Sequence, residues 1–118
     1  FSKYVRSKYN VDAAFITMNM PVMVDFLIES GIENPIVCSS INKIGYLMSP
    51  GIQAYEEALK AKPFRPMAMS ILASGAIAPE SAVQYITGFE KINSVVFGAS
   101  SRTNIMNTKQ LLDKYWGN

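Results

Sequence analysis

The most informative segment of the sequence is Met67-Ala-Met-Ser-Ile-Leu-Ala-Ser-Gly-Ala-Ile-Ala-Pro-Glu80. Residues 67–72 are an apolar run typical of a buried β-strand. Residues 73–77 form a turn of mostly small residues, and Pro79 with Glu80 is a favourable pair for the first turn of a helix. The segment therefore predicts one β-strand/α-helix unit, with a helix that continues to about Thr87.

The same order of strand, turn and amphipathic helix recurs along the chain about every 25 to 30 residues, the length expected of a βα unit. The predicted strands are residues 13–18, 35–39, 67–72 and 94–97. The predicted helices are residues 22–30, 52–61, 79–87 and 104–115. In the first helix Met23, Phe26 and Leu27 fall on one face, which we expect to be buried. Strands that alternate with helices predict a parallel sheet with right-handed crossovers.

Four consecutive βα units predict an α/β fold, either half of a TIM-type (β/α)8 barrel or a small open doubly wound sheet. We expect the half barrel, as a single domain over residues 1–118. Because Phe1 is neither a Met start nor part of a signal peptide, we expect a fragment of a longer chain. A half barrel exposes strand edges and inner side chains such as Phe15, Met69 and Phe97. A missing N-terminal half or a second copy, in a homo-oligomer, is expected to cover them.

Composition limits the possible partners and the location. Of the 118 residues 49% are hydrophobic, which favours an ordered core. The net charge of +2 comes with scattered Lys and Arg residues, so we expect no nucleic-acid partner. No apolar run is long enough to span a membrane. The single cysteine, Cys38, is expected in the core of a cytoplasmic protein, and the absence of His argues against a metal site.

Two turns that contain glycine and serine follow the third and fourth predicted strands. They are Ser74-Gly75 and Gly98-Ala-Ser-Ser101. In TIM barrels the loops after the last two strands bind phosphate through backbone N–H groups, and glycine permits close approach. The predicted phosphate site therefore contains Ser74, Gly75, Gly98, Ser100 and Ser101, with Arg102 as a charge partner. The alternative is two ordinary turns, in which Gly serves geometry and Ser caps helices.

The last fifty residues or so resemble a known family. The segment Ala68-Met-Ser-Ile-Leu-Ala-Ser-Gly-Ala-Ile77 resembles the seventh strand and turn of aldo-keto reductase-like barrels, and Val96-Phe-Gly-Ala-Ser-Ser101 with Asn104 resembles their last strand and loop. The resemblance, over about residues 67–108, implies an oxidoreductase that binds NADP. It implies that Ser100, Ser101 and Arg102 lie near the adenosine phosphate and Asn104 near the adenine. The family's catalytic residues lie in its N-terminal half, which this chain does not contain.

Three further residues are candidates for contacts with a substrate. Asn19 follows the first predicted strand, Ser39 ends the second, and Lys43 lies in the long loop after it. Barrel enzymes place substrate contacts at these strand ends, and a lysine there can bind an anion. The alternative is that these polar groups only meet water.

The sequence supports two hypotheses about function. In the first, the chain is the phosphate- or nucleotide-cofactor-binding half of a barrel enzyme, an aldo-keto reductase-like oxidoreductase whose catalytic residues lie elsewhere. In the second, it is a non-catalytic half-barrel module that self-associates and has a binding or structural role. No pair of carboxylates is placed at the strand ends for acid–base catalysis, so the catalytic residues stay unknown.

Overall fold

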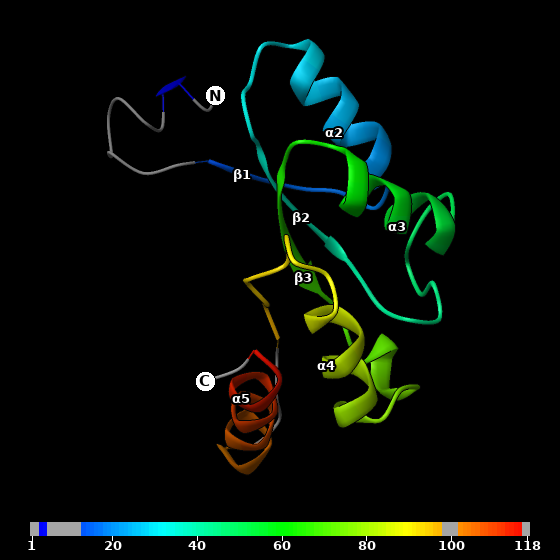
Figure 1. The fold of residues 1–118 in the computed structure, drawn as a ribbon, viewed down its shortest axis with the longest axis vertical. Coiled ribbons are helices and arrows are strands. Elements are labelled where there is room, and N and C mark those ends of the chain that lie inside the picture. Colours follow the sequence, from blue (N-terminus) through cyan, green and yellow to red (C-terminus); the bar gives the residue numbers. More distant parts are fainter. Residues whose placement is uncertain (1–2, 5–12, 98–101, 117–118) are drawn as a thin grey trace.

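The computed structural model describes residues 3–4, 13–97 and 102–116 and has an α/β fold with alternating βα units (Figure 1). The strands are β1 (Ala14–Ile16), β2 (Ile36–Ser40) and β3 (Arg65–Met69). The helices are α2 (Met20–Glu29), α3 (Ile52–Ala61), α4 (Pro79–Thr87) and α5 (Arg102–Tyr115), with a short 3-10 turn at Ala73–Gly75. The predicted ranges of α3 and α4 are confirmed without change.

The three strands form one parallel sheet in the order β1-β2-β3. After α4 the chain returns to the free edge of β3, where Ala68 and Val95 form an isolated parallel bridge. Val96 N–H donates to the Ala68 carbonyl at 2.8 Å, and Ala68 N–H donates to the Ser94 carbonyl at 3.0 Å. The predicted fourth strand, 94–97, is therefore present only as this bridge, because its hydrogen bonds reach one residue of β3.

The third strand also ends earlier than predicted. Residues 67–72 were expected to be extended, whereas β3 covers Arg65–Met69. Ser70 has a φ of 53°, in the left-handed region, and this turns the chain out of the sheet direction. Ile71 and Leu72 therefore belong to the turn, although their side chains are as apolar as those of the strand.

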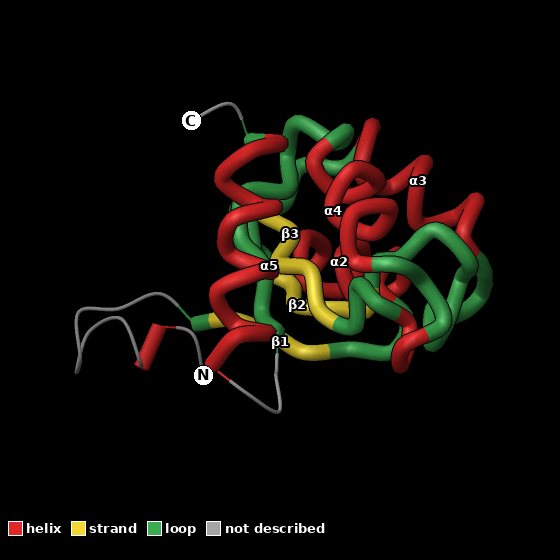
Figure 2. Tube along the Cα trace, turned by 90° about the horizontal axis from the view of Figure 1, so that it is seen from below, coloured by secondary structure: helices red, strands yellow, loops and turns green. Residues whose placement is uncertain are grey.

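The helices α2, α3 and α4 lie on one side of the strands (Figures 1 and 2). The core lies between them and one face of the sheet, and it includes Val24, Leu27, Val37, Tyr55, Leu59, Ala68, Val83 and Ile86. Parallel strands joined by right-handed crossovers in sequential order place their helices on the same face, which explains the arrangement. Burial of this apolar surface is the main source of stability.

The buried face of α2 differs from the prediction. Met20, Val24 and Leu27 are buried, whereas Phe26 is 62% exposed. The helix begins two residues earlier than expected, at Met20, because the Asn19 side chain accepts a hydrogen bond from Val22 N–H and caps it. Only Leu27 of the three residues expected on that face is fully buried.

The face of the sheet away from these helices carries apolar side chains. Ile16 pairs with Cys38, which pairs with Met67, and Ile16 is 70% exposed. Phe15 was expected on this face, but it pairs with the buried Val37 and packs against the core. Because side chains alternate along a strand, Ile16 takes the exposed position that was predicted for Phe15.

Helix α5 packs against α4 near the C-terminus of the described chain. The Gln84 amide donates to the Tyr115 hydroxyl at 2.8 Å, and Leu112 is buried. Tyr115 and Trp116 pack against the core and anchor the end of this helix. Within the ranges that the structure describes, no helix is long and apolar enough to cross a membrane.

Candidate functional site

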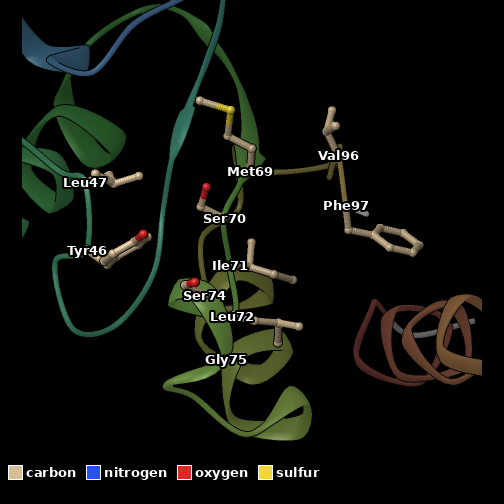
Figure 3. A pocket seen from close by; sticks show the side chains of 10 residues that line it. All are labelled: Tyr46, Leu47, Met69, Ser70, Ile71, Leu72, Ser74, Gly75, Val96 and Phe97. Atoms are coloured by element: carbon tan, nitrogen blue, oxygen red, sulfur yellow. The ribbon is translucent and has the colours of Figure 1, made fainter. Parts of the chain in front are cut away.

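A pocket of about 480 Å³ lies where the chain leaves the carboxyl end of β3 (Figure 3). Three segments form its walls: the loop after β2, the end of β3 with the turn that follows, and the segment after the Val95 bridge. The lining residues are Tyr46, Leu47, Met69, Ser70, Ile71, Leu72, Ser74, Gly75, Val96 and Phe97. In Figure 3 the first two lie on one side and the last two on the other, with Ser70 and Ser74 between them.

The turn after β3 brings Ser74 and Gly75 to the pocket through unusual backbone angles. Ser70, Ala73 and Ser74 have φ values of 53°, 49° and 57°, and Gly75 has 92°. For residues other than glycine the left-handed region costs about 1 to 3 kcal/mol when the surroundings enforce it. Such strain is concentrated at ligand-binding and switch segments, so this turn is a candidate functional segment.

Backbone N–H groups of this turn already have acceptors within it. Gly75 N–H donates to the Leu72 carbonyl at 3.0 Å, and Ile77 N–H donates to the same carbonyl at 3.1 Å. Ala76 N–H donates to the Ala73 carbonyl at 3.2 Å. A phosphate could use these donors only if the turn opened. What this turn offers a ligand as it stands is therefore chiefly the Ser74 hydroxyl.

Asn42 joins two walls of the pocket. Its Nδ2 donates to the Tyr46 carbonyl at 2.9 Å and to the Ser70 carbonyl at 3.2 Å. Its Oδ1 accepts from Tyr46 N–H at 2.8 Å. Asn42 is only 1% exposed, so its amide depends on these protein partners for its hydrogen bonds. Asn42 therefore fixes the loop after β2 against the turn after β3.

Of the predicted phosphate-binding residues, the structure places Ser74 and Gly75 in the pocket wall. Arg102 and Asn104 lie exposed in the first turn of α5. Gly98, Ser100 and Ser101 lie outside the described residues.

The three predicted substrate contacts are dispersed. The Asn19 side chain caps α2. Ser39 is fully buried on the helix-facing side of the sheet, where its hydroxyl has no hydrogen-bond partner among the residues described. Lys43 is exposed and does not line the pocket. The structure therefore does not bring these three together.

Sequence reasoning missed Asn42 and Tyr46 as site residues. The signal that was available is the composition of residues 40–51, whose Asn, Gly, Ser and Pro residues suit an irregular functional loop. That composition identifies the loop as a whole but not its individual site residues. The hydrogen bond between Asn42 and Ser70 can be seen only in the folded chain.

Two further reactive side chains, Cys38 and Tyr85, do not line this pocket. Cys38 is buried, and desolvation raises the pKa of its thiol. Desolvation, followed by the hydrogen bond to Glu56, raises the pKa of Tyr85. No group of three or more metal-ligating side chains occurs in residues 3–4, 13–97 and 102–116.

Comparison of the chain with protein families, with curated proteins and with solved structures found no match.

Proposed function

We propose that this chain binds a phosphate-bearing small molecule at the carboxyl ends of its parallel strands, as one half of a TIM-type barrel enzyme. NADP or another phosphorylated ligand is the proposed partner, and an aldo-keto reductase-like oxidoreductase is the enzyme class that the sequence resemblance favours. The catalytic residues would then come from another half. The single cysteine, Cys38, is a free thiol and fits a reducing compartment, which supports a cytoplasmic location.

The strand order supports the half barrel over the doubly wound sheet. In a barrel each strand lies beside the next one in the chain, and all helices lie outside. The order β1-β2-β3 followed by Val95 fits this rule. A doubly wound sheet needs a reversal of strand order, and the described strands with the Val95 bridge show none.

The observation that carries the proposal is the position of the pocket. Ser74 and Gly75 from one Gly/Ser turn lie in its wall with Val96 and Phe97, which come directly before Gly98 of the other turn. The first motif and the described segment that precedes the second motif in the sequence therefore line the same pocket. Ligands of parallel α/β folds bind at this end of the strands.

Ligand-dependent melting tests the proposal. A ligand at 100 times its dissociation constant stabilises a folded protein by about 2.7 kcal/mol, so NADPH, NADH or inorganic phosphate is expected to raise the melting temperature. Gly98→Val is expected to abolish this shift while the helical content stays the same, because a side chain there blocks close approach. No shift with any of the three compounds would refute the proposal.

The proposed charge partner, Arg102, has a matched control on the same helix. Arg102→Gln is expected to weaken phosphate binding about tenfold, since a charge-assisted hydrogen bond is lost. Lys109→Gln removes the same charge two turns further along α5, where Lys109 pairs with Asp113, and is expected to leave the affinity unchanged. Equal losses in both variants would indicate a general effect of net charge and exclude a specific role for Arg102.

The open face of the sheet favours a second candidate function, a non-catalytic half barrel that self-associates. Ile16 and Val96 are 70% and 51% exposed, and both lie at free edges of the paired strands. A strand edge without a neighbouring strand, together with exposed apolar side chains, favours pairing with another chain. In this alternative the binding partner is a second copy of the chain.

A further inference from the structure

The part of the pocket that the structure describes is suited to an uncharged group. Its lining includes the apolar side chains of Leu47, Met69, Ile71, Leu72 and Val96, and none of its described residues is charged. Ion binding without a nearby charge or available donors is costly, because the ion loses its water. The backbone amides of Gly75, Ala76 and Ile77 are already hydrogen-bonded within their turn. Inorganic phosphate would therefore leave the apolar side chains of this pocket without an apolar group to contact.

The backbone of one aromatic residue in the wall is fixed by hydrogen bonds. Tyr46 is 39% exposed, and both polar groups of its backbone are hydrogen-bonded to the buried side chain of Asn42. An aromatic residue on a fixed backbone offers a rigid flat surface at low cost in entropy. The hydroxyl groups of Ser70 and Ser74 lie between Tyr46 and Val96 (Figure 3). They provide hydrogen-bonding capacity beside an otherwise apolar surface.

We propose that this pocket receives an uncharged aromatic or heterocyclic ring, which is the body of the phosphorylated ligand. The ring contacts Tyr46 and the apolar wall, and polar atoms at its edge meet Ser70 or Ser74. A volume of about 480 Å³ lies in the range of small-molecule pockets, which are mostly apolar with a few placed polar groups. This inference rests on the proposed function, because it names the ligand class for the same site.

A series of phosphate compounds tests the inference by calorimetry. Phenyl phosphate carries a ring, methyl phosphate carries only a methyl group, and inorganic phosphate carries neither. We expect phenyl phosphate to bind about tenfold or more tightly than the other two, since burial of a ring adds apolar contact area. Equal affinities of the three compounds would overturn the inference and leave phosphate binding in place.

A substitution in the wall provides the second measurement. Tyr46→Ala is expected to remove most of the advantage of phenyl phosphate over inorganic phosphate, while the affinity for inorganic phosphate stays the same. Tyr46→Leu serves the same purpose if the alanine variant does not fold. Phe26→Ala is the matched control, because Phe26 is an exposed aromatic residue on α2 that does not line the pocket. An unchanged ratio of affinities in both Tyr46 variants would overturn the inference.

Phenol separates the two proposals. If phenol binds and Tyr46→Ala weakens it, while no phosphate compound binds more tightly than phenol, the ring site stands and the proposed phosphate function fails. If inorganic phosphate binds and phenol does not, and phenyl phosphate gains nothing, the phosphate function stands and the ring site fails. Absence of binding by all four compounds would overturn both.

Discussion

Asn42 is the residue on which the shape of the pocket depends most. Its replacement by Ala leaves the Ser70 carbonyl and both backbone groups of Tyr46 without these partners. A buried polar group that loses its partner costs about 1 to 3 kcal/mol. We therefore expect Asn42→Ala to lower the free energy of unfolding by about 2 kcal/mol or more, measured by urea denaturation.

Two further variants test this assignment. Asn107→Ala removes the same amide from an exposed position on α5 and is expected to change stability by less than about 0.5 kcal/mol. Asn42→Asp has nearly the same shape and keeps an acceptor for Tyr46 N–H, but it loses both Nδ2 bonds. It is expected to be destabilised as well. Equal stability of Asn42→Ala and Asn107→Ala would contradict the role given to Asn42.

At the scale of elements, one hydrogen bond joins α3 to α4. The Tyr85 hydroxyl donates to Glu56 Oε2 at 2.7 Å. Burial, and then the Glu56 carboxylate, raises the pKa of Tyr85 above its ordinary value of 10.0. Above that pH the unfolded chain releases the tyrosine proton while the folded chain keeps it. Unfolding then releases protons, so this contribution to stability is present below pH 10 and is lost as the pH rises further.

We therefore expect Tyr85→Phe to lose less stability than the unsubstituted chain on going from roughly pH 9 to 11, the range in which a free tyrosine ionises. Urea denaturation at a series of pH values measures this difference. Tyr46→Phe is the control, since it removes a tyrosine hydroxyl from an exposed loop position. If the Tyr85→Phe and unsubstituted chains lose stability in parallel, folding does not raise the pKa of Tyr85.

Local sequence signals predicted the helices better than the strands. Both ends of α4 were correct, because Pro79 fits a first turn and Gly88 follows the last one. The end of β3 was wrong, because the left-handed φ of Ser70 leaves no trace in an apolar run. In α2 the capping role of Asn19 moved the start of the helix and changed which side chains are buried.

In the candidate site, too, the residues that belong to local patterns were predicted and those that depend on tertiary contacts were not. Ser74 and Gly75 were predicted from a glycine-containing turn after a strand, which is a local pattern. The contribution of Asn42 was not predicted, because its partner Ser70 is 28 residues away and the bond exists only when two loops meet. The hydrogen bond from Gly75 N–H to the Leu72 carbonyl was not predicted either. It depends on the backbone angles of the turn, which the residue types alone do not determine.

At the scale of the whole molecule, the sheet is covered on one face and apolar on the other. Ile16 is the most exposed large apolar side chain of the described strands, and it lies on β1, which pairs only with β2. A free strand edge beside exposed apolar side chains favours association with another chain. Both candidate functions require that this face be covered, either by the other half of a barrel or by a second copy.

The isolated chain is therefore expected to self-associate, with a sedimentation coefficient that rises with protein concentration. Ile16→Lys is expected to shift the association constant about tenfold or more toward the monomer, because a charge on this face must be desolvated in the complex. It is not expected to lower the melting temperature of the monomer, since Ile16 is 70% exposed. Phe26→Lys places the same charge at an exposed apolar position on α2, on the helix side, and is expected to associate like the unsubstituted chain. A monomer at every concentration, or an equal effect of both substitutions, would show that the open face of the sheet does not form the contact.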